Sequence, residues 1–483
     1  MGSLEQLREL VRTKLKEVLL LVVSNRGPYL LREKGVRPPS GLVTALDPVM
    51  RTCGGVWVAS NQEQEGADCP VRLSIPPEEP RYTLRQVFLS KEEQDGFYYG
   101  LANEMLWPLC HIVHVRPTFR HTDWEQYLRV NQLFAEALLE EIGDREALVW
   151  SQDFHLSLLP QLLKEKRPDL LIGHFWHIPW PNPEAFRICP WKQELLEGLL
   201  GADLLGFHIR YHCDNFLKTV AMELEAKVIE ETSAVQYQNH TTYVKPFPIS
   251  IDYHGIQREL QGPEVQAEVQ KIQKLLKRPP EFLAVGVDRI DYTKGIEERL
   301  QAIERFLEKY PEYQGRFVYL GVGSPSRVHL KIYQRLWSRI LDLVETVNRR
   351  FHSESWQPIV FFDEHVGYPR ILAYYAVADL ALVSALHDGM NLVAKEFIAA
   401  QPDDDPGVLI LSQFTGSARE LHEALLINPY DREEFADAIK RGLEMPKEER
   451  TRRMRWLKAW IEEHDIYRWA FSFLNELSHL RRG

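Results

Sequence analysis

Short apolar runs that alternate with longer segments of helical periodicity constrain the fold of this chain more than any other feature. In the first half the apolar runs cover residues 18–23, 55–59, 147–151, 170–176 and 203–207. Short apolar runs between amphipathic helical segments are typical of parallel strands that helices cover on both faces. The pattern predicts an α/β fold built around a doubly wound sheet.

A second series of such runs follows an interruption in the pattern. The interruption covers residues 243–249, where Pro246 and Pro248 restrict the backbone, and a polar helical segment follows at 262–277. A chain of 483 residues is longer than one hydrophobic core usually spans. We therefore predict two Rossmann-like domains, residues 1–250 and 251–455, and a C-terminal helix within 456–483 that packs back on the first domain. The second series comprises residues 282–287, 316–322, 358–362, 378–384, 408–411 and 424–427.

Charge and cysteine content exclude several classes of protein. The net charge of −11 argues against a nucleic-acid or anionic-lipid surface. The five cysteines are widely spaced and contain no Cys-x-x-Cys pair, which argues against a disulfide framework and a zinc site. The run 18–23 is too short to cross a membrane. We expect a cytoplasmic protein without a metal or cofactor, and a homo-oligomer remains open.

The segment 385–396 sets Asp388 and Glu396 at the edges of a turn that leads from a strand into a helix. Gly389 lets the backbone approach a ligand closely, and the amides at a helix start attract negative charge. A sugar diphosphate would suit this turn. Alternatively, Asp388 or Asn391 only caps the helix. The segment by itself leaves both interpretations open.

Arg289 and Lys294 follow the expected strand 282–287 directly. Open α/β sheets bind ligands at the carboxyl ends of their strands, so two facing domains would form a central cleft there. Each charge-assisted hydrogen bond to a diphosphate contributes about 1.5–3 kcal/mol. The alternative is an internal salt bridge with Asp288 or Asp291.

Further candidates also lie near strand ends. Arg26 ends the first apolar segment and can hold an anion, while Gly41 permits close backbone approach after the loop that contains residues 39–40. Asp153 and His177 can orient sugar hydroxyls or act as an acid/base pair. His155 and His174 are expected to be buried histidines without a catalytic role.

Arg327 stands at the expected start of a long helix and could hold a phosphate there, although a plain surface arginine is the alternative. Tyr98 and Trp107 could pack on a sugar face, but aromatic residues at this spacing are usually core residues.

Together these segments resemble the trehalose-6-phosphate synthase family of retaining glucosyltransferases, from Ser24 to about Trp469. The first sixteen or so residues lie outside the resemblance. The motifs that carry it are residues 24–26, 54–57, 106–108, 124, 127–131, 177–179, 204–207, 289–295, 326–327 and 388–396.

The resemblance implies a GT-B fold, UDP-glucose or another nucleoside diphosphate glucose as donor, glucose 6-phosphate as acceptor and trehalose 6-phosphate as product. It also implies a same-face displacement without a protein nucleophile, in which the leaving phosphate oxygen takes the proton of the attacking hydroxyl. The catalytic set would be Asp153, His177, Arg289, Lys294 and Asp388.

The resemblance assigns the donor to a group of eleven residues. Arg289 and Lys294 would hold the diphosphate, Glu396 the ribose, and Asp388 and His177 the glucose hydroxyls. The other donor residues would be Gly41, Gly389, Met390, Asn391, Leu392 and Val393.

For the acceptor, Asp153, Tyr98 and Trp107 would position the sugar, Arg26 and Arg327 would bind its phosphate, and Trp57 would shape the pocket. A phosphate held by both Arg26 and Arg327 would bridge the two domains. Arg327→Ala should then raise the KM for the acceptor.

The chain departs from the common family pattern at Gln152, Phe154, His387 and residues 58–61. These positions lie beside the expected sugar and phosphate sites. The donor nucleotide therefore stays open between UDP, GDP and ADP. Two other functions also stay open: a synthase that uses another phosphorylated acceptor, such as glycerol 3-phosphate or a cyclitol phosphate, and a non-catalytic sugar-phosphate sensor.

Overall fold

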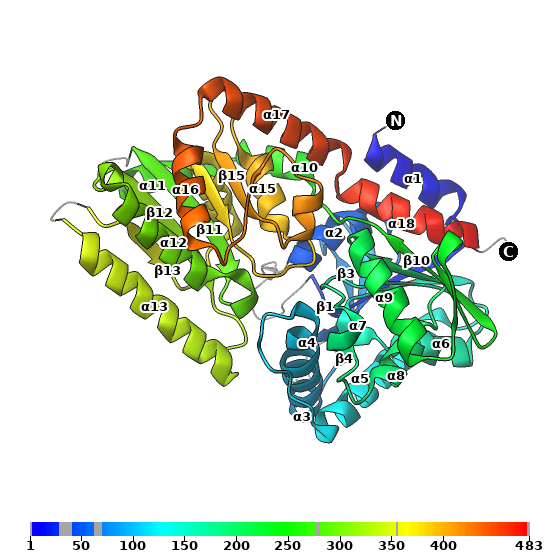
Figure 1. Ribbon diagram of the computed structural model, residues 1–483. Coiled ribbons are helices and arrows are strands. Elements are labelled where there is room, and N and C mark those ends of the chain that lie inside the picture. The colour runs from blue at the N-terminus through cyan, green and yellow to red at the C-terminus, as the bar shows by residue number, and fades with distance from the viewer. Residues whose placement is uncertain (1, 29–40, 62–69, 276–280, 354–355, 481–483) are drawn as a thin grey trace. The chain divides into compact units, whose positions relative to one another are not determined.

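The computed structural model describes residues 2–28, 41–61, 70–275, 281–353 and 356–480 (Figure 1). The chain forms two compact units. The first unit comprises Met1–Ile249 and Ile466–Gly483, and the second comprises Ser250–Asp465. The chain therefore returns to the first unit ten residues later than predicted. The reason is that Met454, Leu457 and Ile461 of helix α17 (Lys447–Glu463) pack into the core of the second unit.

The first unit contains a ten-stranded sheet in the order β3-β4-β2-β1-β5-β6-β7-β10-β9-β8. The seven strands from β4 to β10 in this order are parallel, and the outer pairs β3/β4, β10/β9 and β9/β8 are antiparallel. The strands are β1 (Leu19–Arg26), β2 (Val56–Asn61), β3 (Arg72–Ile75), β4 (Tyr82–Phe88), β5 (Ala147–Gln152), β6 (Leu171–Phe175), β7 (Leu204–Phe207), β8 (Lys227–Ile229), β9 (Ala234–Tyr237) and β10 (His240–Pro246).

The interruption predicted at 243–249 is wrong in its first half. Residues 243–246 belong to β10, which pairs with β7 from Tyr243 to Pro246. Pro246 is tolerated because it is the last residue of the strand, where the missing N–H costs least. The edge strands β3 and β8 and their neighbours β4 and β9 were not predicted. Strands β3, β8 and β9 are short and partly exposed, β4 mixes apolar and polar residues, and none of the four carries a continuous apolar run.

Helices cover the first sheet and connect its strands. The α-helices are α1 (Ser3–Thr13), α2 (Gly41–Cys53), α3 (Lys91–Gln94), α4 (Trp107–His111), α5 (His121–Ile142), α6 (Leu159–Lys166), α7 (Pro183–Phe186), α8 (Lys192–Leu199), α9 (Arg210–Glu223) and α18 (Ile466–Leu480). A π-helical segment, η2 (Asp95–Leu106), and the 3₁₀ turns η3 (Phe154–Leu156) and η4 (Glu230–Thr232) complete the unit.

Helix α18 brings the end of the chain into the core of the first unit. Its Phe473 stacks on Trp150 with ring centroids 5.0 Å apart. Gly173 and Gly206 make room for this ring, since a β-carbon on either glycine would lie within 2.8 Å of it. Helix α1 packs against α18 (Figure 1), and Lys14 Nζ donates to Asn475 at 2.9 Å.

The second unit contains six parallel strands in the order β13-β12-β11-β14-β15-β16, as the apolar runs predict. The strands are β11 (Phe282–Arg289), β12 (Phe317–Ser324), β13 (Ile359–Phe362), β14 (Leu380–Val383), β15 (Val408–Ser412) and β16 (Leu425–Ile427). The helices are α10 (Tyr253–Leu260), α11 (Pro263–Leu275), α12 (Ile296–Lys309), α13 (Lys331–Phe351), α14 (Tyr368–Val377), α15 (Leu392–Ala400), α16 (Arg432–Leu443) and α17 (Lys447–Glu463), with 3₁₀ turns η5 (Tyr292–Lys294), η6 (Pro311–Tyr313) and η7 (Gly416–Arg419).

Alternation along the strands gives this sheet an apolar core on each face. Along β11, Leu283 and Val285 face the core formed with α10, α11, α14, α15 and α17. Ala284, between them, faces the opposite core, formed with α12, α13 and α16. The sheet is therefore doubly wound, with helices on both faces.

Among the parallel strands of each sheet the strand order reverses once, and this places the ends of two strands beside each other. In the second unit the reversal lies between β11 and β14, and in the first it lies between β1 and β5. Connections leave such neighbouring strands in opposite directions and open a crevice at their carboxyl ends. No helix in the described part of the chain is both long and apolar enough to span a membrane.

Candidate functional site

The reversal in the second unit brings Lys294 and Asp388 together. Lys294 ends the short turn after β11, and Asp388 lies in the loop after β14. Lys294 Nζ lies 2.5 Å from Asp388 Oδ2, and both side chains are mostly buried. The alternative considered for Lys294, a salt bridge with Asp288 or Asp291, is not the ion pair found here, because Lys294 pairs with Asp388.

Close backbone approach holds these two loops in place. The Leu386 amide donates to the Thr293 carbonyl at 2.7 Å, and the Ser384 hydroxyl donates to the Gly295 carbonyl at 2.8 Å. Gly295 has a φ of +61°, and a β-carbon on it would lie 2.1 Å from the Ser384 carbonyl oxygen. Only glycine fits this crossing.

The turn from Asp388 to Asn391 leads directly into α15. Asn391, with a φ of +73°, is the N-cap residue, and its side-chain oxygen accepts from the Ala394 amide at 3.2 Å. The helix-cap alternative is therefore correct for Asn391. Its side-chain nitrogen also donates to Asp388 Oδ2 at 3.1 Å, so the cap orients the carboxylate. Leu392 and Val393 follow in the first turn of the helix, where amides lack intrahelical acceptors.

A segment after β15 supports this turn from behind. The Ser417 amide donates to the Met390 carbonyl at 2.9 Å, and its hydroxyl donates to the Asn391 carbonyl at 3.0 Å. A β-carbon on Gly416 would lie 2.1 Å from the Gly389 carbonyl oxygen. Sequence reasoning missed Gly416 and Ser417, although they follow a strand end as the predicted residues do.

Glu396 lies one turn further along α15 and is partly exposed. Its carboxylate makes no hydrogen bond with any residue that the structure describes. Desolvation, with the nearby charge of Glu259 as a smaller contribution, raises the pKa of Glu396 to about 8. Hydrogen bonds from ligand hydroxyls would replace the lost water, favour the carboxylate and so lower this pKa.

Arg327 differs from its prediction in two respects. It does not start the helix, because α13 begins at Lys331 and Arg327 lies in the preceding turn with a φ of +50°. It is not a surface residue either, since its side chain is buried and contacts Asp291 at 2.6 Å and the Tyr333 hydroxyl at 2.5 Å. Arg327 and the first amides of a helix therefore do not form the phosphate site that was predicted for them. The guanidinium pairs with the Asp291 carboxylate instead.

Asp291 is the centre of a buried polar cluster. It also accepts from the Thr293 amide at 3.0 Å and from the Thr293 hydroxyl at 2.9 Å. Burial opposes ionisation of Asp291, but the charges of Arg327, Arg289 and Lys294 outweigh it and lower the pKa to about 2. Arg289, the last residue of β11, therefore lies near enough to contribute to the same field.

At the reversal in the first unit, Arg26 ends β1. Its guanidinium donates to the Tyr98 hydroxyl at 2.5 Å and lies over the Tyr98 ring. Behind it, Trp57 donates to the Ser24 hydroxyl at 2.8 Å, which in turn donates to the Arg26 carbonyl at 2.7 Å. Trp57 is fully buried, so in this structure it supports Arg26 from the core and lines no surface.

Asp153 and His177 follow the neighbouring strands β5 and β6. Asp153 has a φ of +73°, an uncommon conformation for this residue type that often marks a functional site. Its Oδ1 accepts from the His177 amide at 3.2 Å. Desolvation, with the neighbouring His208, His174 and His155, lowers the pKa of His177 well below its usual range, so the imidazole is neutral.

The remaining residues of the first unit take mainly structural positions. His174 is buried on β6 with Nδ1 3.1 Å from the Ser151 hydroxyl, and desolvation lowers its pKa to about 3, as expected for a core histidine. Tyr98 stacks on His155, and Trp107 contacts Phe154. Both Tyr98 and Trp107 are nearly buried, so only small parts of their rings could meet a ligand.

Gly41 is the first described residue of α2, and it is exposed. The preceding residues 39–40 of the expected substrate loop lie outside the described part of the chain.

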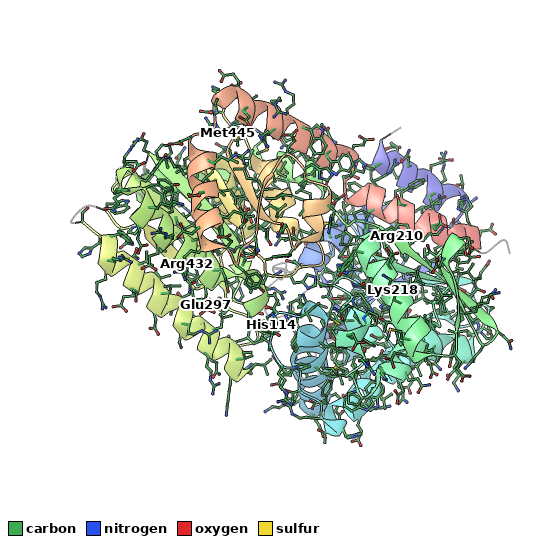
Figure 2. The ribbon with its side chains drawn as sticks, in the orientation of Figure 1. His114, Arg210, Lys218, Glu297, Arg432 and Met445 are labelled. Atoms are coloured by element: carbon green, nitrogen blue, oxygen red, sulfur yellow. The ribbon has the colours of Figure 1, made fainter. Side chains whose placement is uncertain are left out.

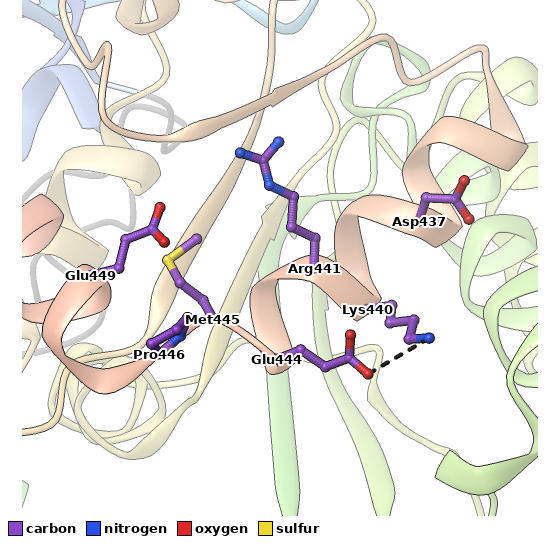
Figure 3. A pocket seen from close by; sticks show the side chains of 7 residues that line it. All are labelled: Asp437, Lys440, Arg441, Glu444, Met445, Pro446 and Glu449. Atoms are coloured by element: carbon purple, nitrogen blue, oxygen red, sulfur yellow. Dashed lines mark ion pairs between the residues drawn. The ribbon is translucent and has the colours of Figure 1, made fainter.

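A surface pocket of about 350 Å³ lies elsewhere, between the end of α16 and the start of α17 (Figure 3). Met445 in this connection and Arg432 at the start of α16 locate it in Figure 2. Acidic and basic side chains mix in the pocket, and Lys440 pairs with Glu444 at 3.6 Å. It shares no residue with the predicted site.

Comparisons with known proteins agree with this arrangement. The family model described as "Glycosyltransferase family 20" matches residues 20–479. A trehalose-6-phosphate synthase of Mycolicibacterium vanbaalenii is 39% identical over 473 residues, with 95% of each chain covered. A bifunctional trehalose-6-phosphate synthase/phosphatase of Thermoproteus tenax is 38% identical over 95% of this chain and 63% of its own length.

Solved structures give the same result. The E. coli protein bound with UDP-2-fluoro glucose matches with a TM-score of 0.86 and 32% identity, over 95% of this chain and 98% of that chain. A trehalose-phosphate synthase from Burkholderia xenovorans in complex with glucose-6-phosphate matches with a TM-score of 0.88 and 29% identity, over 95% of this chain and 99% of that chain.

The fold and the matches define a glycosyltransferase with two Rossmann-like α/β units, and the predicted GT-B fold class is confirmed. The chain belongs to glycosyltransferase family 20.

Proposed function

We propose that this protein transfers glucose from a nucleoside diphosphate glucose, with UDP-glucose as the first candidate, to glucose 6-phosphate. The products are α,α-trehalose 6-phosphate and the nucleoside diphosphate. The observation that carries the proposal is the meeting of Lys294, Asp388 and the start of α15 at the strand-order reversal of the second unit. The names and bound ligands of the relatives support the same substrates.

On the donor side, the diphosphate would replace Asp388 as the partner of Lys294. Phosphate oxygens would meet Lys294, Arg289 and the first amides of α15, while Gly41 would approach through its own amide. Asp388, released from the lysine but still held by Asn391, could then accept from glucose hydroxyls. Gly389 and Met390 would form the backbone of the turn.

Further along the same helix, Glu396 would accept from the ribose hydroxyls. Leu392 and Val393 would lie beside the nucleoside. Both are partly exposed, and each packs by its other side against the core of the second unit.

On the acceptor side, Arg26 and Arg327 would bind the phosphate, and Asp153, Tyr98 and Trp107 would position the sugar. The Asp153 side chain retains a small accessible fraction, 13%. Trp57 would act indirectly by fixing Ser24 and thereby Arg26. His177 would contact the donor glucose with its neutral ring.

The reaction would proceed on one face of the donor sugar with retention of configuration. The bond from the anomeric carbon to the phosphate oxygen breaks, the acceptor hydroxyl forms the new bond, and its proton passes to the leaving phosphate. Arg289, Lys294 and the helix amides would stabilise the charge that develops on the leaving group. Positioning of both substrates would supply much of the remaining acceleration.

The test is a matrix of UDP-, GDP- and ADP-glucose against glucose 6-phosphate, glycerol 3-phosphate and glucose, with release of nucleoside diphosphate and product mass as readouts. We expect turnover only with a phosphorylated acceptor and a product of the mass of trehalose phosphate. Turnover with glycerol 3-phosphate alone would assign another acceptor. Binding without turnover in every combination would instead indicate a sugar-phosphate sensor.

A further inference from the structure

Gln152 is a buried residue whose position is fixed by the sheet. It is the last residue of β5, pairs with Phe175 of β6 and is fully buried. The next residue, Asp153, donates its amide to the Phe175 carbonyl at 2.6 Å. The side chain of Gln152 therefore starts from a rigid backbone beside the expected sugar-binding residues.

Among the residues that the structure describes, the Gln152 side chain has one hydrogen-bond partner, and this partner is a candidate catalytic group. Its Oε1 lies 2.8 Å from Nε2 of His177. An amide oxygen can only accept, so Nε2 carries the proton of the imidazole. Because the ring is neutral, its other nitrogen, Nδ1, then has a free lone pair.

The surroundings leave Nδ1 of His177 open. Nδ1 makes no hydrogen bond with a described residue. It is also not one of the fully buried polar atoms that lack a partner, whereas Nε2 of Gln152 is one of them. His177 as a whole is partly exposed. Its backbone is fixed twice, because its amide donates to Asp153 and its carbonyl lies 3.0 Å from Nε2 of His208.

Ring packing prevents the imidazole from turning easily. Phe175, His208 and Trp469 lie around it, with ring centroids 4.6, 5.4 and 6.2 Å away. The titratable groups that face it are Asp153, which contacts its amide, and the histidines at 155, 174 and 208. Among these contacts, only that of Gln152 reaches a ring nitrogen.

We propose that Gln152 is a positioning residue that holds His177 as the Nε2–H tautomer and so presents Nδ1 as a hydrogen-bond acceptor to a hydroxyl of the donor sugar. This inference rests on the proposed function for its substrate, but the tautomer itself does not depend on any substrate. A tautomer fixed by a second residue selects which hydroxyl arrangement the ring can bind.

The direct test is nitrogen NMR of the full-length protein with ¹⁵N-labelled histidine. The His177 signal is assigned by its loss in His177→Gln. We expect a protonated Nε2 and an unprotonated Nδ1 in the wild type at neutral pH. In Gln152→Met, which keeps the length of the side chain and removes the acceptor, the two tautomers should mix or reverse.

Kinetics supply the second readout. In Gln152→Met, kcat should fall about 10- to 100-fold, by analogy with the range found for residues that orient metal-bound histidines. The KM for glucose 6-phosphate should change little. In Gln152→Glu the added charge should stabilise the imidazolium, so the acid limb of the pH–kcat profile should move to higher pH.

Gln86→Met is the matched control. Gln86 is equally a buried glutamine in the first sheet, on β4, and donates to the Pro70 carbonyl at 2.8 Å. Its variant should lose comparable thermal stability while it keeps the His177 spectrum and the pH profile.

A wild-type spectrum with the proton on Nδ1 would overturn the proposal. So would a Gln152→Met protein that retains the wild-type tautomer and kcat. If the wild type transfers no glucose but its tautomer depends on Gln152, the proposed function fails and the positioning role stands.

Discussion

At the scale of single residues, Glu396 has a charge state that depends on pH. Its pKa of about 8 in the folded protein lies above the ordinary value of 4.5 because burial disfavours the carboxylate. Between these two values the folded state holds a proton that the unfolded state has lost. Stability of the ligand-free protein should therefore decrease as the pH rises through this window and level off above the folded pKa.

Glu396→Gln tests this charge state. It should stabilise the ligand-free protein at pH 8–9, a window set by the pKa of about 8, and have little effect near pH 5, measured by urea unfolding. The same variant should weaken nucleoside diphosphate binding in calorimetry, because it loses an anionic acceptor for the ribose. Wild-type affinity should increase as the pH rises toward 8. Equal stability of both proteins across this range would contradict the assignment.

Arg327 combines a structural and a binding role, so a single substitution cannot separate them. Arg327→Ala removes an ion-pair partner of the buried Asp291 carboxylate, which should destabilise the protein by about 3–5 kcal/mol. The double variant Arg327→Ala/Asp291→Asn should recover much of this loss, as measured by unfolding.

If Arg327 binds the acceptor phosphate, the KM for glucose 6-phosphate should stay strongly raised in the stabilised double variant. Asp291→Asn alone and Tyr333→Phe, which removes the hydroxyl beside Arg327, are its controls and keep the guanidinium. A wild-type KM in the double variant would assign Arg327 to structure alone.

At the scale of elements, the loops after β11 and β14 cross at the proposed donor site. Gly295→Ala would introduce both an unfavourable backbone conformation and a clash with the Ser384 carbonyl. Gly315→Ala is a matched control, because Gly315 has a φ of +81° and open space around its Cα. Gly315→Ala should lower the free energy of unfolding by about 1–2 kcal/mol, because alanine is disfavoured in the left-handed conformation.

Gly295→Ala should lower the free energy of unfolding by clearly more than Gly315→Ala does. It should also raise the KM for the nucleotide sugar. Thermal unfolding and donor kinetics of the two variants measure this difference. Equal losses in both would mean that the close approach is not needed.

The sequence predicted these elements unevenly, and the reason is physical. Central strands such as β11 and β14 are buried on both faces, so their continuous apolar runs mark them. Edge strands such as β8 bury one face or less and give no such run. Lys294 and Asp388 could be predicted as site residues because each follows the end of a strand. No local pattern could show that the two side chains pair, since they are 94 residues apart in the sequence.

At the scale of the whole molecule, the alternation of strands and helices was sufficient to predict two doubly wound units. The order of the strands in each sheet was not predictable, and neither was the residue at which the chain returns to the first unit. Both depend on contacts between segments that are distant in the sequence. The chain returns to the first unit at Ile466, where Phe473 of α18 packs over Gly173 and Gly206. The hydrophobic periodicity of the sequence does not show this contact. The proposed role of Gln152 was missed for the same reason, since its partner His177 lies 25 residues away, just after the next strand.

The most direct test of the central claim is an NMR experiment on the reaction of the purified protein with ¹³C-labelled UDP-glucose and unlabelled glucose 6-phosphate. We expect the label to appear in α,α-trehalose 6-phosphate, with both anomeric signals in the α configuration and one UDP formed for each product. A β-configured product would contradict the retaining displacement. No transfer with UDP-, GDP- or ADP-glucose, from a protein that is shown to be folded, would contradict the proposed function itself.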